Sequence, residues 1–191
     1  MVASTPQTPT STAATGQRGT RNWWQRFMRL LRHRWDEPQA RRLMTPTLQR
    51  SLAEQISRSE ATHTGQIAIY VEGGLPGHYV REDKTARDRA WALFGKLGVW
   101  DTADNNGVLI YLLIAEHAIE IVADRGLRAR LDDAAWQPVV EHLGTALRAG
   151  DYARGLQLAV EEVGVLLAAH FPRHDPATRQ PNEVPDMPGF R

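Results

Sequence analysis

An unbroken apolar run, Val108 to Ile114, organises the hydrophobic pattern of the chain. Its seven residues suit a strand that is buried on both faces and are few for a helix. A second apolar segment, Ala118 to Val122, follows after the short interruption Ala115-Glu116-His117. The two segments therefore predict a β-hairpin in the middle of a sheet.

Two helices and one more strand are predicted before this hairpin. Thr45 followed by Pro46 is typical of a helix start, and apolar residues at helical spacing carry that helix to about residue 62. Residues 66–72 alternate as a strand with both faces at least partly covered, residues 73–79 form a Gly- and Pro-rich loop, and residues 82–97 form a helix. The order strand, helix, buried strand makes a crossover unit, which is expected to be right-handed.

The chain after the hairpin is predicted to be helical. A short helix is expected at residues 127–131, and longer helices with one apolar face are expected at 133–149 and 152–171. From Pro172 to Arg191 the chain is Pro-rich and polar, which predicts a loose tail. Residues 44–171 therefore form the folded domain. Its predicted class is α/β, with a small mixed sheet and helices on both faces.

The net charge of +1 conceals two oppositely charged parts of the chain. Residues 1–50 hold nine Lys and Arg against two Asp and Glu, whereas residues 51–191 hold 14 against 20. A basic arm thus precedes an acidic domain. Within the arm, residues 1–20 have too few large apolar groups to offset the entropy lost on folding, so they are predicted to be disordered.

Residues 21–40 are predicted to form a basic amphipathic helix and a connector. Apolar side chains recur along residues 21–35 at helical spacing, and arginines occupy most of the remaining arc. Tryptophans on an apolar stripe with an Arg-rich polar face are typical of a helix that lies on an anionic membrane surface. The residues expected to contact the membrane are Trp23, Trp24, Phe27, Arg29, Leu31 and Trp35.

The same stripe is equally suited to docking on the domain or on a protein partner, and the sequence leaves this choice open. Nucleic acid is not expected as a partner, because the acidic domain would repel phosphates. The chain shows neither the roughly 20-residue apolar run of a transmembrane helix nor the apolar core of a signal peptide. We therefore expect a cytoplasmic protein, peripheral to the membrane if residues 21–35 bind lipid.

Cysteine is absent from the chain. This excludes disulfides, Cys-ligated zinc and thiolate catalysis. Any metal must therefore be held by other ligands.

Side chains that carry oxygen gather immediately before the buried strand. Asp101, Asp104, Asn105 and Asn106 precede Gly107. Carboxylate and amide oxygens clustered in one loop suit Ca²⁺ or Mg²⁺, although the spacing is not that of an EF-hand loop. Asp and Asn before Gly are also ordinary turn residues. A turn without a metal is therefore the alternative.

Asp124 follows the second strand of the hairpin. In an antiparallel pair this end adjoins the beginning of the first strand, so Asp124 is expected to approach the two asparagines. Carboxylates gathered at one sheet end repel one another unless a cation or a proton separates them, which favours a metal site. The guanidinium of Arg125 is the alternative neutralising group. Asp133 is a further candidate ligand, unless it or Asp132 serves as a helix N-cap.

Taken together, these segments resemble the TPM domain family, which takes its name from thylakoid-lumen, photosystem-repair and receptor-modulator members. The residues that carry the resemblance are Asn105-Asn106-Gly107-Val108-Leu109-Ile110, Ile119-Glu120-Ile121-Val122, Asp124-Arg125-Gly126-Leu127, Asp133, Gly150-Asp151-Tyr152 and Gly155-Leu156. The resemblance covers about residues 45–170 and implies a three-layer α/β/α sandwich with a central sheet. Trp100-Asp101-Thr102 before the Asn pair suggests a short, cytoplasmic bacterial subfamily.

The resemblance implies function only loosely. Some members of the family are described as acid phosphatases, some as Ca²⁺ binders, and others as membrane-anchored helpers of larger complexes. This chain shows neither the signal peptide nor the C-terminal transmembrane helix of many bacterial members. Arg125 also departs from the family pattern, because it stands in a turn where many members have Gly or Tyr residues nearby.

Three functions stay open. The first is a binding or assembly-helper module that holds a divalent cation at the acidic end of the sheet and reaches a membrane or a partner through residues 21–35. The second is a metal-dependent phosphatase with Arg125 binding the phosphate. A metal would polarise the phosphate and activate water, held by Asp101, Asp104, Asp124 and Asp133. The phosphatase ranks second because the sequence shows no obvious nucleophile. The third is a structural domain without a ligand.

Overall fold

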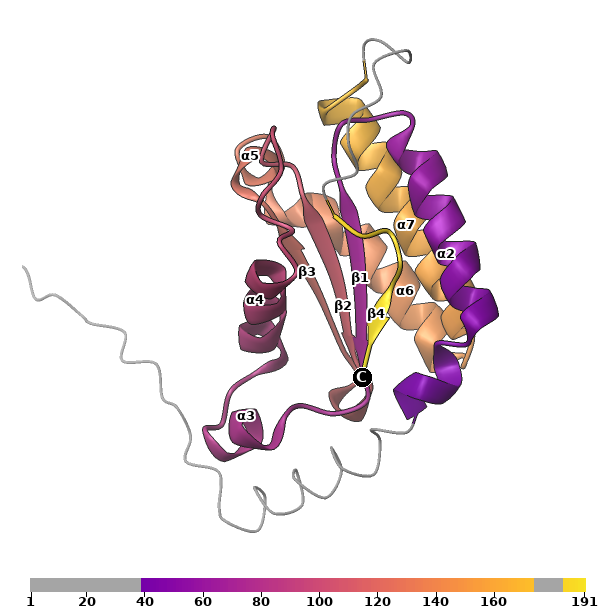
Figure 1. Ribbon diagram of the computed structural model, residues 1–191, viewed down its shortest axis with the longest axis vertical. Helices are drawn as coiled ribbons and strands as arrows, with labels where there is room; N and C mark the ends of the chain where they lie inside the picture. The colour runs from indigo at the N-terminus through magenta and orange to yellow at the C-terminus, as the bar shows by residue number, and fades with distance from the viewer. Residues whose placement is uncertain (1–38, 174–183) are drawn as a thin grey trace, which may run out of the picture.

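The computed structural model of the chain describes residues 39–173 and 184–191, which form three layers (Figure 1). Within these residues the middle layer is a four-stranded sheet in the order β3-β2-β1-β4. The strands are β1 (Ile67–Glu72), β2 (Val108–Leu113), β3 (Ala118–Ala123) and β4 (Gly189–Phe190). β1 is parallel to β2 and to β4, and β2 is antiparallel to β3. The sheet is therefore mixed, as predicted.

Helices cover both faces of the sheet (Figure 1). One face carries α2 (Pro46–Glu60), α6 (Gln137–Arg148) and α7 (Tyr152–His170), and the other carries α3 (Gly77–Arg81) and α4 (Ala86–Lys96). The short elements are η1 (Ile114–Glu116), α5 (Arg125–Arg128) and η2 (Asp133–Trp136). This arrangement confirms the predicted three-layer α/β/α fold.

The apolar run at residues 108–114 divides the hydrophobic core in two. Val108 and Ile110 pack with α2, α6 and α7, whereas Leu109 and Tyr111 pack with α3 and α4. Successive side chains of a strand point to opposite faces. A strand covered on both faces therefore needs apolar residues at every position, and all of β2 is buried.

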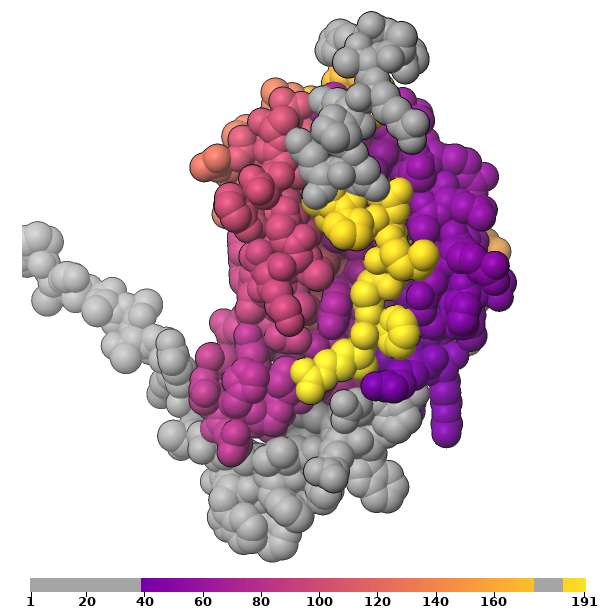
Figure 2. Space-filling view, in the orientation of Figure 1, coloured from indigo at the N-terminus to yellow at the C-terminus, as the bar shows by residue number. Residues whose placement is uncertain are grey.

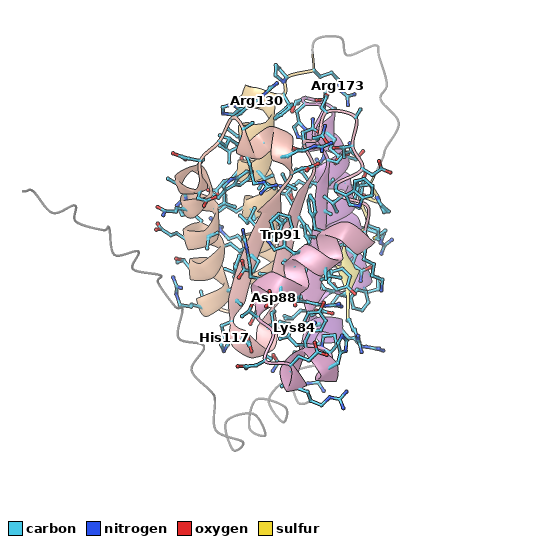
Figure 3. The ribbon with its side chains drawn as sticks, turned by 90° about the vertical axis from the view of Figure 1, so that its left-hand side faces the viewer. Lys84, Asp88, Trp91, His117, Arg130 and Arg173 are labelled. Atoms are coloured by element: carbon cyan, nitrogen blue, oxygen red, sulfur yellow. The ribbon has the colours of Figure 1, made fainter. Side chains whose placement is uncertain are left out.

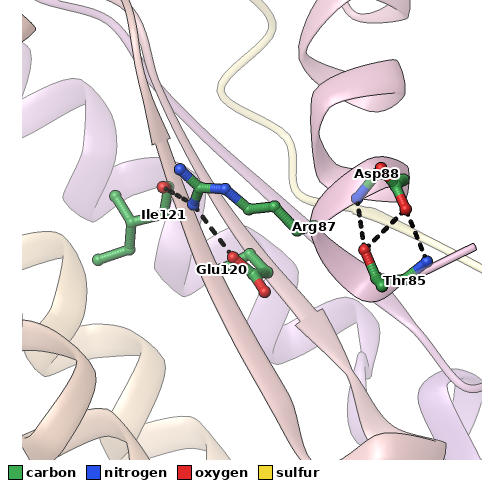
Figure 4. Close-up of polar contacts among 5 residues, drawn as sticks. All are labelled: Thr85, Arg87, Asp88, Glu120 and Ile121. Carbon is green, nitrogen blue, oxygen red and sulfur yellow. Dashed lines mark hydrogen bonds and ion pairs between the residues drawn. The ribbon is translucent and has the colours of Figure 1, made fainter. Parts of the chain in front are cut away.

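The helix predicted at residues 82–97 corresponds to α4, which begins only at Ala86, whereas α3 begins inside the loop predicted at residues 73–79. α3 ends at Arg81, Asp83 has a left-handed backbone angle (φ 54°), and α4 begins after Thr85. Aspartate tolerates this angle better than most residues, so the sequence does not reveal the break as a glycine would. Thr85 and Asp88 form a reciprocal capping box that fixes the start of α4 (Figure 4).

Other helix boundaries follow local chemistry. Thr45 caps α2 as predicted, because its hydroxyl accepts from Leu48 N–H and Pro46 occupies the first turn. The helix predicted at residues 133–149 begins instead as the 3-10 helix η2. Pro138 lies in the first turn of α6, where its missing N–H removes a bond to the preceding turn.

The end of the chain differs most from the prediction. A loose tail was expected from Pro172, but residues 184–191 lie along β1 and supply β4. Val184 is only 3% exposed and joins the core between the sheet and α4. A strand of two residues is too short to leave a periodic hydrophobic pattern, so this strand could not be predicted from the sequence.

The outer edge of β3 is partly covered by a side chain from α4. Asp124 N–H donates to Gly107 O, so the alternation of an antiparallel ladder leaves the backbone groups of Ile121 on the free edge. Arg87 Nη1 donates to Ile121 O (3.0 Å) and to Glu120 Oε2 (3.1 Å), as Figure 4 shows. The guanidinium therefore covers an acceptor that an edge strand would otherwise offer to another chain.

Candidate functional site

Three segments meet at the end of the sheet where β1 and β2 begin and β3 finishes. They are residues 62–66, the loop at 101–107 and the turn at 124–126. Asp124 N–H donates to Gly107 O and Gly126 N–H donates to Asn105 O, both at 2.9 Å. The expected approach of Asp124 to the Asn pair is therefore present in the structure.

Asn106 is fully buried and connects the loop to the segment after α2. Its Nδ2 donates to Thr64 Oγ1 (2.9 Å), and Thr64 Oγ1 in turn donates to Asp104 Oδ2 (2.8 Å). The backbone N–H of Asn106 donates to Thr102 Oγ1 (3.0 Å). Its Oδ1 is buried and has no hydrogen-bond partner among the described residues.

Asp124 is 7% exposed and forms the N-cap of α5. Oδ1 accepts from the N–H of Arg125 (2.6 Å), whereas Oδ2 is buried without a partner in the described part of the chain. The Arg125 guanidinium does not pair with Asp124. Its Nε donates to Asn105 Oδ1 (2.6 Å) instead. Neutralisation of Asp124 by the nearby Arg125 charge, without a hydrogen bond between the two side chains, stays an alternative.

The other predicted ligands lie in more ordinary positions. Asp101 is exposed at the start of the loop, and its N–H donates to Gly98 O. Asp132 is the N-cap of η2, where its carboxylate accepts from Ala135 N–H (3.1 Å), and Asp133 is the exposed first residue of that helix. Across residues 39–173 and 184–191, no three His, Asp or Glu side chains gather closely enough to hold a metal ion.

Some side chains at this end of the sheet carry oxygens of the kinds that bind hard cations. Two of the buried oxygens that lack partners among the described residues, Asn106 Oδ1 and Asp124 Oδ2, are the amide and carboxylate types that Ca²⁺ and Mg²⁺ prefer. Gly126 brings the turn against the loop, since a Cβ there would lie 2.6 Å from Asn105 O and 2.7 Å from Asp104 O. The carboxylates alone are too few to coordinate a cation, so amide and backbone oxygens would have to complete its coordination.

The membrane-contact residues predicted between Trp23 and Trp35 lie outside the described residues. In the part of the chain that the structure describes, no helix has the length and apolarity that crossing a bilayer requires.

Sequence reasoning missed a buried histidine near this site. His63 Nδ1 lies 3.0 Å from Gly65 O, and its Nε2 lies 3.0 Å from Ser59 Oγ. A carbonyl oxygen only accepts, so Nδ1 carries the proton and Nε2 accepts from the Ser59 hydroxyl. Burial lowers the pKa of His63 to about 4. A signal existed, since Leu52, Ile56, Ser59 and His63 follow one helical stripe.

A buried ion pair between the sheet and α4 was also missed. Glu72, at the end of β1, is fully buried and accepts two hydrogen bonds from Arg89 on α4. Tyr111 OH donates to the same carboxylate (2.8 Å). Burial raises the pKa of Tyr111, so its hydroxyl stays protonated and keeps this role as a donor. The Arg89 guanidinium also lies 5.3 Å from the centre of the Tyr79 ring.

A groove of about 730 Å³ lies away from the acidic loop, between the closed end of the hairpin and α6. Leu147 and Tyr152 contribute to its walls, and His117 lies at its edge. Figure 3 shows His117 at one end of the molecule and Arg130 and Arg173 at the other. The position of His117 in the turn opposite the acidic cluster matches the prediction, and none of the predicted ligands lines this groove.

The family model of the TPM domain matches residues 39–166. The chain belongs to the TPM domain family. The match begins at residue 39, where the chain is already helical, and Ala40 and Met44 are buried in the core. No curated protein matches the sequence.

Two solved structures share the TPM-domain fold of this chain. The BA42 protein from the psychrophilic bacterium Bizionia argentinensis is 24% identical with a TM-score of 0.66, over 77% of this chain and 94% of that protein. The N-terminal domain of a protein from P. gingivalis is 20% identical with a TM-score of 0.57, over 70% of this chain and 83% of that domain. At these identities the likeness shows the fold alone.

Proposed function

We propose that this TPM domain is a divalent-cation-binding module, with the cation held where the loop at 101–107 meets the turn at 124–126. The observation that carries the proposal is the pair of buried oxygens without partners, Asn106 Oδ1 and Asp124 Oδ2. A buried polar atom without a bond costs free energy, on the order of 1–3 kcal/mol. A cation that bonds these atoms would remove that cost.

Asp124 and Asn106 would supply buried ligands, and Asp104 and Asn105 would supply ligands nearer the surface. A bound Ca²⁺ or Mg²⁺ would supply positive charge beside the carboxylates of this acidic domain. It would also connect segments that are joined here by a few hydrogen bonds. We assign the module a binding or assembly-helper role, in which the cation stiffens one end of the sheet for a partner.

A metal-dependent phosphatase is the second candidate. The observation in its favour is that Arg125 is exposed beside Asp124 and is oriented by its bond to Asn105. An exposed, oriented guanidinium is suited to phosphate. Hydrolysis of p-nitrophenyl phosphate that requires a metal and is lost in Arg125→Gln would place this candidate ahead of the binding role.

Thermal unfolding of the full chain in EDTA, and then in excess Ca²⁺, Mg²⁺ or Mn²⁺, tests the cation site. A ligand at about 100 times its Kd stabilises a fold by about 2.7 kcal/mol, which raises Tm by several degrees. Asp124→Asn should abolish that rise, because Asn keeps the N-cap and removes the charge. Glu54→Gln, on the exposed side of α2, is the matched control and should keep the full rise. No rise with any metal would refute the site.

A further inference from the structure

Residues 184–191 lie on the outer edge of β1 and form a strip on the surface beside α2 (Figure 2). The TPM domain match ends at residue 166, so this segment lies outside the matched residues. Without it, β1 would be an edge strand of the sheet. We propose that this edge is a strand-addition site for an extended polypeptide segment of a partner, and that residues 184–191 are its occupant within this chain.

The backbone of β1 presents a row of outward groups along this edge. Gln66 O accepts from Val108 N–H on the β2 side, so alternation places the N–H and C=O of Ile67, Ile69 and Val71 on the opposite side. Glu60 Oε1 accepts from Ile67 N–H (2.9 Å) and thus satisfies the start of the edge. The remaining outward backbone groups of β1 are left for pairing with a neighbouring strand, the position that β4 holds in this chain.

The backbone of Arg191 forms hydrogen bonds with the outward groups at the C-terminal end of β1 and just beyond it. Its N–H donates to Val71 O (3.0 Å), and its C=O accepts from Gly73 N–H (2.8 Å). These bonds extend the parallel pairing of β4 beyond its two strand residues. Backbone bonds of this kind give affinity for any extended segment, whatever its sequence.

Side chains add selectivity at two positions. Val184 is buried among the residues between the sheet and α4, and its N–H donates to Gln66 Oε1 (3.2 Å). Gly189 lies over the Tyr70 ring, where a Cβ would approach within 2.5 Å of a ring carbon. The site therefore fits an aliphatic anchor followed five residues later by glycine.

The occupant is held by few contacts. The strand pairing covers two residues, and Met187 and Phe190 stay 52% and 38% exposed. Segments with few buried apolar contacts open locally at a small fraction of the global unfolding free energy. A partner segment with the same pattern would compete for the edge while the three-layer core stays intact.

Fluorescence anisotropy of a labelled peptide with the sequence of residues 184–191 tests the proposal on the full chain. The wild-type tail competes at the millimolar effective concentration of a tethered segment, so Gly189→Val should bind the peptide at least about tenfold more tightly than the wild type. A peptide that carries the same Gly→Val change should not bind. The control Met187→Ala alters an exposed residue of the same segment and should behave as the wild type.

Two outcomes of that experiment would overturn the proposal. One is equal binding, or no binding, by the wild type and by a Gly189→Val protein with the wild-type circular dichroism spectrum. The other is a Gly189→Val protein that is unfolded, since the tail would then be inseparable from the core.

Hydrogen exchange on the unaltered chain gives a second measurement. Gly73 N–H is held by Arg191, whereas Val108 N–H is held by Gln66 in the middle of the sheet. We expect Gly73 to exchange at least about tenfold faster than Val108, through local release of the tail. Equal protection of the two amides would show that the tail leaves only when the whole domain unfolds.

Discussion

Arg89 holds Glu72 with two parallel hydrogen bonds inside the core, Nη2 to Oε1 at 2.6 Å and Nε to Oε2 at 2.9 Å. This pair connects the end of β1 to α4 across the face of the sheet opposite α2, α6 and α7. A buried ion pair stabilises a fold little relative to well-packed apolar residues, but removal of one partner leaves the other charge buried alone.

Arg89→Met should therefore destabilise the domain strongly, by about 3–5 kcal/mol in urea unfolding at pH 7. Addition of Glu72→Leu to that variant should recover much of the loss, because no buried charge would then be left unpaired. Arg87→Met is the matched control, since it breaks the more exposed ion pair with Glu120 and should cost about 1 kcal/mol or less. Similar losses for Arg87 and Arg89 would contradict this account.

His63 should make the domain sensitive to mild acid. Burial, the largest cause, and the nearby Arg173 charge lower its pKa from 6.5 to about 4 in the folded state. Below pH 6.5 the unfolded chain binds a proton that the folded chain does not, so stability is lost as the pH falls from 6.5 to 4, by about 3 kcal/mol. Thermal unfolding across this range should show a smaller loss for His63→Gln. The exposed substitution His78→Gln should leave the loss unchanged.

Glu60 should make the pH dependence of stability run in the opposite direction to that of His63. Burial is the main cause that raises its pKa from 4.5 to about 8 in the folded state. The unfolded chain gives up its proton first, so this group's contribution falls as the pH rises from 4.5 to 8. Glu60→Gln keeps an oxygen for Ile67 N–H, and should raise Tm at pH 8 but not at pH 4.5. An equal rise in Tm at pH 4.5 and at pH 8 would show that the stabilisation does not come from the titration of the Glu60 carboxyl group.

Gly126 should be difficult to replace at the candidate site. Gly126→Ala would push the turn at 124–126 away from Asn105 O, with loss of both stability and the metal-induced rise in Tm. Gly95→Ala is the matched control, because it meets open space on α4 and should stabilise the helix by about 0.5–1 kcal/mol. A full metal response in Gly126→Ala would separate this turn from any cation site.

The parts of the fold that the sequence predicted are those with a local cause. The hairpin follows from an apolar run that a strand buried on both faces requires, and Thr45-Pro46 marks a helix start by its own chemistry. The break between α3 and α4 includes one left-handed residue, Asp83, and an aspartate does not reveal that backbone angle in the sequence. β4 is two residues long and owes its place to β1 rather than to its own pattern.

The same distinction applies to the candidate site. Antiparallel geometry alone places Asp124 beside the Asn pair, so that approach was predictable. The bond from Arg125 to Asn105, and the oxygens left without partners, depend on side-chain rotamers that spacing does not fix. Arg89 follows Ala86 by three residues on the apolar stripe of its helix, which is a visible anomaly. Its partner Glu72 could be named only once the end of β1 was known to lie within reach of Arg89 on α4.

A sheet can lengthen into a fibril only when both of its outer strands accept a new strand. In this protein the Ile121 carbonyl on β3 is held by a guanidinium, and β1 is covered by the chain's own final residues. A second copy would have to displace a charged group on one side and eight ordered residues on the other before stacking could begin. Both edges of the sheet are therefore protected against pairing with another chain. Loss of the Arg87 side chain would most directly expose one of them, the outer edge of β3.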